Sequence, residues 1–142
     1  MADFTFNSAK KYIANGTIDL DTDTLYILLT TSSYTPDQDN HEFRSDVTNE
    51  LAASGGYATG GFALTGQAVT QDNVGNRAVF DADDWVQALT FTGARWGILY
   101  KHRGGAASAD ELIRCIDFGS AQNATGTFTI AFGTNGIITF ED

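Results

Sequence analysis

The sequence predicts a mainly β fold: a single-domain antiparallel β-sandwich or flattened barrel of about eight strands, with one or two short helices near the N-terminus. Fifteen glycines against one proline, among many threonines and serines, indicate many turns between short strands. Several segments alternate apolar and polar residues with the two-residue period of a strand. A chain of 142 residues can bury a core of its own, so residues 1–142 are expected to form one β-rich domain.

The first expected helix covers residues 4–13. Asn7 or Ser8 would cap its start. Asn15-Gly16 would end it, although the same dipeptide also forms tight hairpin turns.

A second helix is expected over residues 42–51. Phe43, Val47 and Leu51 recur there at a spacing of four residues, so they would form one apolar stripe against the core. Gly55-Gly56 would end this helix.

The expected strands combine apolar alternation with flanking turn residues, and they cover residues 25–31, 60–64, 67–70, 77–81, 89–101, 111–118, 127–132 and 137–140. Residues 25–31 are almost continuously apolar, which predicts a central strand that is covered on both faces. Trp96, Ile98 and Tyr100 should share one face of their strand. Residues 119–126 are expected to form a polar loop.

The charge of the chain narrows the classes of partner. Eight Lys and Arg stand against eighteen Asp and Glu, for a formal net charge of −10. Nucleic-acid binding requires a basic surface that neutralises phosphates, so no nucleic-acid partner is expected. The same charge disfavours anionic membranes, and it is compatible with docking on a basic protein surface.

No secretory signal or membrane span is recognisable, so the chain is expected to be made in a cytoplasm and to stay soluble. Cys115 is the only cysteine, which excludes an internal disulfide. It lies in an apolar strand and is expected to be a buried structural thiol.

No residue pattern predicts an enzyme, a cofactor or a catalytic site. His41 and His102 are far apart, and no Gly-x-Ser-x-Gly elbow is present. Asp19, Asp21 and Asp23 alternate as calcium ligands can, but the glycine and the distal glutamate of the helix-loop-helix calcium site are missing. Turn-forming aspartates are the favoured interpretation, no metal site is predicted, and calcium binding stays open.

Several segments together resemble a family of small virion structural proteins of tailed bacteriophages. They are residues 15–24, 29–39, 43–50, 78–84, 97–101 and 116–119, so the resemblance covers nearly the whole chain. It implies a non-enzymatic virion component assembled in the host cytoplasm, with capsid decoration or cementing as the preferred role. Its partners would be the major capsid protein or other virion proteins, and the chain would itself be a dimer or trimer.

The predicted contact surface is the polar loop of residues 32–41, because loops on a rigid scaffold commonly carry binding. Its candidate contact residues are Tyr34, Pro36, Asp37, Asp39 and His41. Trp85 is expected to be a further exposed aromatic.

Two other functions remain open at this point. The first is a neck- or tail-associated virion module, or one that binds a glycan or receptor, with Tyr34, Tyr57 or Trp85 facing a sugar. The second is a small hydrolase that uses a pair of carboxylates.

Overall fold

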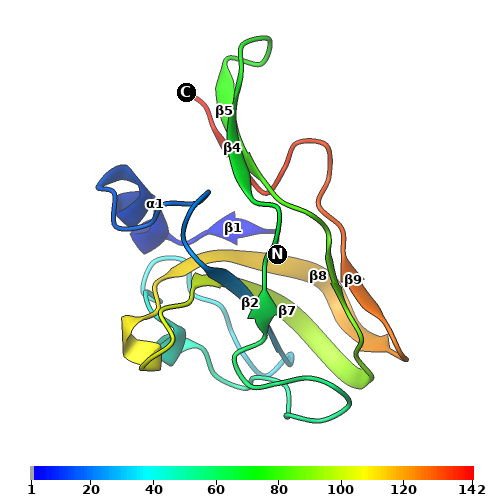
Figure 1. Cartoon of the computed structure of the whole chain (residues 1–142). Coiled ribbons are helices and arrows are strands. Elements are labelled where there is room, and N and C mark those ends of the chain that lie inside the picture. Colours follow the sequence, from blue (N-terminus) through cyan, green and yellow to red (C-terminus); the bar gives the residue numbers. More distant parts are fainter. Residues whose placement is uncertain (1) are drawn as a thin grey trace.

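Three antiparallel sheets share one core in the computed structural model, which describes residues 2–142 (Figure 1). The largest has the order β1-β8-β7-β2-β3, with bounds Phe4–Thr5, Leu112–Ala124, Phe91–Lys101, Leu25–Thr30 and Phe62–Ala63. The second has the order β10-β5-β4, with bounds Ile138–Phe140, Arg77–Asp81 and Ala68–Asp72. The third pairs β6 (Trp85–Gln87) with β9 (Phe128–Ile130). The mainly β, antiparallel, sandwich-like prediction is therefore confirmed, with ten strands instead of about eight.

The five-stranded sheet is covered on both faces, as the continuous apolar run of β2 predicts. Ile27 and Leu29 point toward the two smaller sheets, where they join a core that includes Phe80 and Trp85. Leu28 points the other way, into a second cluster. Trp96, Ile98 and Tyr100 all belong to that second cluster, so the prediction that they share a face is confirmed.

Helix α1 (Asn7–Ala14) follows β1 and ends where the sequence predicts. Gly16 has a φ of +83°, a conformation that glycine adopts without a steric penalty. The predicted start and cap are wrong: residues 4–5 form β1, and Phe6 is the N-cap residue without a side-chain cap. Asn7 lies inside the helix, and its backbone N–H donates to Gln38 O at 3.1 Å, so a neighbouring loop satisfies this helix end. None of the described helices is long and apolar enough to cross a membrane.

The predicted helix over residues 42–51 is wrong. Only a 3-10 turn, η1 (Arg44–Asp46), forms there. The Asp46 carboxylate accepts the backbone N–H of Glu42 at 2.8 Å and the next N–H at 3.0 Å. Beyond the turn, Leu51 N–H donates to Leu29 O at 2.9 Å. Backbone hydrogen bonds to the sheet have replaced those of a helix, and the segment lies as a strap across the sheet end.

The predicted polar loop over residues 119–126 is also wrong. Strand β8 continues to Ala124, and Gln122 pairs with Ala94 on β7. Gly119 has a φ of +80° within β8, and Gly93 has a φ of +83° on β7 near the shifts in register between the two strands. Glycines that suggest a turn in the sequence thus lie inside or beside irregular strand pairing.

Candidate functional site

Tyr34 is a core residue, so its predicted role as an exposed contact residue is wrong. Its side chain is 1% exposed, its hydroxyl hydrogen-bonds with His41 Nδ1 at 2.9 Å, and its carbonyl accepts the Trp96 indole N–H at 3.2 Å. Burial raises the pKa of the Tyr34 phenol. Pro36 is buried as well. These residues therefore hold the loop against the sheet and are not available to a partner.

The accessible part of this loop is its tip at residues 37–40. The Asp37 carboxylate accepts the backbone N–H groups of Asp39 and Asn40 at 3.0 and 3.1 Å, and hydrogen bonding from Asn40 lowers the pKa of Asp37. Asp39 is exposed and accepts the Asn7 side-chain amide at 2.8 Å. His41 is half-buried, and its Nδ1 also accepts the Asp37 N–H at 3.3 Å. A contact through this tip stays a prediction.

Trp85 is 2% exposed, so the prediction of an exposed aromatic is wrong. Its indole N–H donates to Phe62 O at 3.2 Å. Tyr57 is 4% exposed, and its hydroxyl donates to Glu50 at 2.7 Å while accepting the Leu29 N–H at 3.0 Å. The three aromatic side chains that were expected to face a sugar are therefore part of the core.

Asp19, Asp21 and Asp23 lie together in the acidic turn at residues 19–23. Asp23 accepts the Asp19 N–H at 2.8 Å and pairs with Lys101 at 2.8 Å. A hydrogen bond between the carboxyl groups of Asp19 and Asp21 lowers the pKa of Asp19 and raises that of Asp21. Among residues 2–142, no group of three or more His, Cys, Asp or Glu side chains is arranged to hold a metal ion.

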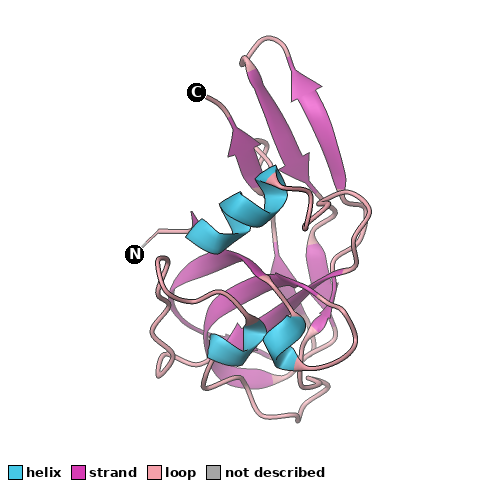
Figure 2. Ribbon diagram, turned by 90° about the vertical axis from the view of Figure 1, so that its left-hand side faces the viewer, coloured by secondary structure: helices cyan, strands magenta, loops and turns pink. Residues whose placement is uncertain are grey.

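The β10-β5-β4 sheet, including the turn at residues 73–76, forms an arm that rises from one end of the molecule (Figures 1 and 2). Four of the five residues of β4 are exposed, in contrast to the buried β2. Asp72 closes the turn, because its carboxylate accepts the Gly75 N–H at 3.0 Å and pairs with Arg77 at 2.9 Å. Val74 at the tip is 97% exposed. The arm is thus an ordered hairpin that presents apolar side chains.

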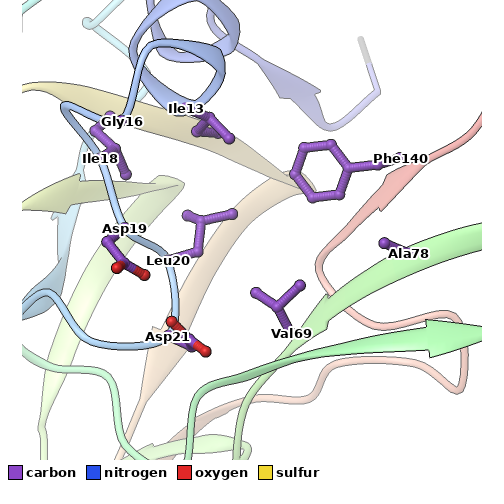
Figure 3. Close-up of a pocket in the computed structure, with 9 residues that line it drawn as sticks. All are labelled: Ile13, Gly16, Ile18, Asp19, Leu20, Asp21, Val69, Ala78 and Phe140. Carbon is purple, nitrogen blue, oxygen red and sulfur yellow. The ribbon is translucent and has the colours of Figure 1, made fainter.

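A groove of about 610 Å³ separates the arm from the end of α1 and the acidic turn (Figure 3). Its lining residues come from both sides: Ile13, Gly16, Ile18, Asp19, Leu20, Asp21, Val69, Ala78 and Phe140. Leu20, Val69 and Phe140 point into the space, and the two carboxylates lie at its edge (Figure 3). A second hollow of about 340 Å³ shares Ile13 and Phe140, so the apolar surface continues between α1 and β10.

The strand register explains why the arm has an apolar face. Phe80 pairs with Val69 and Ile138, and Ala78 pairs with Phe140, so these side chains share one face of the arm. Phe80 and Ile138 are buried in the core, whereas Val69 is 41% and Phe140 37% exposed. This site was not predicted from the sequence. The available signal was the alternation of Ile138 and Phe140, which lie opposite Phe80 and Ala78 on β5.

Cys115 is buried, and His41 and His102 each contact a different tyrosine. Burial raises the pKa of Cys115 to about 12, which suppresses the reactive thiolate. His41 binds Tyr34, and the His102 ring stacks on Tyr26 with centroids 3.9 Å apart. Comparison of the chain with known protein families, with characterised proteins and with solved structures finds no match.

Proposed function

We propose that this chain is a non-enzymatic structural protein of a tailed-bacteriophage virion, which binds the outer capsid surface as a decoration protein. One structural observation carries the proposal. Of the four large hydrophobic side chains that are exposed in residues 2–142, three lie on the arm: Val69, Val74 and Phe140. A projecting element that carries exposed apolar side chains is typical of a protein–protein contact.

The remainder of the fold suits this role. The central sheet is covered on both faces, so the arm stands on a rigid support. The resemblance of residues 15–24, 29–39 and 43–50 to small virion structural proteins supports the same role. A dimer or trimer that makes one modest contact per copy would bind a symmetric particle with high overall affinity, because its later contacts are intramolecular. We include in the proposal that the chain binds as a dimer or trimer, with the major capsid protein or another virion protein as its partner.

The direct test uses particles of the phage that encodes this chain. Mass spectrometry of purified particles should detect the chain, and a particle reconstruction should show its density on the outer capsid surface with the arm toward the shell. Density confined to the neck or tail would replace capsid decoration by the neck- or tail-associated alternative. Absence of the chain from particles would reject a virion role.

A binding experiment tests the arm itself. Val69→Ser and Phe140→Ser should weaken binding of the purified chain to particles that lack it, because each removes apolar contact area from the arm. Val86→Ser is the matched control, because Val86 is 54% exposed but lies on β6, away from the arm. Equal weakening by all three substitutions would contradict docking through the arm.

A further inference from the structure

The groove beside the arm exists without an occupant, and contacts within the chain hold its wall in place. Lys101 Nζ bonds to Thr17 O at 2.7 Å and pairs with Asp23 at 2.8 Å, which fixes the acidic turn to β7. The Ile18 N–H donates to Tyr12 O at 3.0 Å, which ties the same wall to α1. Its volume of about 610 Å³ lies in the range of about 300–1,000 Å³ that is common for ligand pockets. An occupant would therefore not have to order the wall that the acidic turn and α1 form.

The edge of the groove is acidic. Asp19 and Asp21 lie at the edge of the larger hollow, and Glu141 lines the adjoining one. Lys10 is the one basic residue that lines either hollow. Asp19 and Asp21 are close enough to hydrogen-bond to each other, so two carboxyl groups crowd one edge of an apolar surface. A cation placed there would relieve their repulsion.

Within residues 2–142, most cations already have an acidic partner in the same chain. Seven of its eight Lys and Arg side chains are in ion pairs within residues 2–142; they are Lys11, Arg44, Arg77, Arg95, Lys101, Arg103 and Arg114. These pairs engage seven acids, which leaves eleven of the eighteen Asp and Glu side chains outside any ion pair in this part of the chain. Two copies facing each other at the groove would bring like charges together.

We infer that the groove binds a segment of a partner protein that carries Lys or Arg next to apolar side chains. The apolar side chains cover Val69, Phe140 and the half-buried Ile13, and the cations meet Asp19 and Asp21. In identifying that partner as a virion protein, the inference rests on the proposed function. The chemistry of the groove itself does not depend on it.

A peptide experiment tests the groove without any particle. The probes are a fluorescent synthetic peptide that alternates Lys with Leu and a matched peptide that alternates Glu with Leu. The Lys peptide should bind by fluorescence anisotropy and shift the methyl signals of Ile13, Leu20 and Val69 in NMR spectra, whereas the Glu peptide should do neither. Equal binding of both peptides, or shifts that avoid these methyl groups, would overturn the inference.

Charge-neutralising variants separate the site from the overall acidity of the chain. Asp19→Asn with Asp21→Asn should weaken binding of the Lys peptide about tenfold at low salt. The matched control is Asp83→Asn with Asp84→Asn, which removes the same charge from exposed positions that do not line the groove. The control should leave affinity within about twofold of the parent. If both double variants lost the same affinity for the Lys peptide, the attraction would be non-specific and the inference would be overturned.

The remaining outcomes distinguish this inference from the proposed function. If the chain binds particles but the Asp19/Asp21 double variant binds them as well as the control does, the virion role stands and the groove is not the contact. If the Lys peptide occupies the groove but particles lack the chain, the groove chemistry stands and the virion role fails. A dimer in sedimentation that dissociates on Phe140→Ser would place a second copy in the groove and overturn the inference.

Discussion

Asp110 is a fully buried carboxylate that joins three segments at one end of the sheet. One of its oxygens accepts Arg44 Nε at 2.8 Å, and the other accepts the backbone N–H of Arg103 at 3.0 Å. Its own carbonyl accepts the Arg44 N–H at 2.8 Å. One charged group therefore adds to the backbone hydrogen bonds that hold the strap at residues 42–51 in place.

Asp110→Ala should lower the free energy of unfolding by about 3–5 kcal/mol, because it leaves a largely buried guanidinium and a backbone donor without a partner. Urea denaturation measures this effect. Lys11→Ala is the control, because the Lys11 side chain is 61% exposed in its pair with Glu42 and should contribute less than about 1 kcal/mol. Equal effects of the two substitutions would contradict the structural role of Asp110.

Cys115 provides a pH-dependent test of burial. Its pKa is raised from an ordinary 9.0 to about 12, first by loss of hydration. Between these values the unfolded thiol ionises while the folded thiol keeps its proton, so this group's contribution to stability is present below about pH 9 and decreases as the pH rises toward 12. At pH 8 the native chain should react with a disulfide reagent only slowly, and chain unfolded in urea should react at once. Rapid reaction of the native thiol would contradict the burial.

At the scale of elements, the turn before β3 depends on a glycine. Gly61 has a φ of +77°, and a Cβ there would lie 1.9 Å from the carbonyl oxygen of Ile27. This close approach brings β3 beside β2, where Phe62 pairs with Ile27.

Gly61→Ala should lower the free energy of unfolding by about 1–3 kcal/mol, since it adds both backbone strain and a steric clash. Thermal or urea denaturation provides the measurement. Gly105→Ala is the control, because an added Cβ at that position meets nothing within 4 Å, and it should change stability by less than about 0.5 kcal/mol. A Gly61 variant as stable as this control would show that the turn can relax.

Elements that a short local pattern of residues determines were predictable from the sequence. The continuous apolar run that forms β2 and the aspartate-closed turn between β4 and β5 both follow local rules. Residues 42–51 were not predictable, because the four-residue spacing of their apolar side chains also suits an extended strap that is bonded to distant strands. The turn-rich context around Trp85 likewise concealed its burial, since the chain re-enters a sheet at that residue.

At the scale of the whole molecule, the groove illustrates what a local pattern cannot show. Ile13, Val69 and Phe140 are far apart in the sequence and come from α1, β4 and β10. The neighbouring sequence of each residue is equally compatible with a buried position. Only the departure of the arm from the body leaves them partly uncovered, and that departure depends on long-range strand pairing. The fold class was therefore predictable, whereas the location of this surface was not.

Under the proposed function, binding to particles should weaken as salt rises from about 0.1 M to about 1 M, because the Debye length falls from about 10 Å to about 3 Å. The acidic edge of the groove would then attract a basic partner less strongly, while its apolar contact would persist. Co-sedimentation with particles at several salt concentrations measures this dependence. The Asp19→Asn/Asp21→Asn double variant should show a shallower salt dependence than the Asp83→Asn/Asp84→Asn control, and parallel curves would contradict the role of the edge charges.

Under the proposed function, the pairing of seven of the eight Lys and Arg side chains within residues 2–142 also affects how copies would crowd on a particle. Each bound copy adds a formal charge of −10 to the outer surface and has little positive charge to turn toward a neighbour. At low ionic strength, repulsion between bound copies would consequently lower the affinity of the remaining sites, so coverage of a shell would limit itself. Added salt would have two opposing effects, because it weakens each individual attachment while it permits denser occupancy.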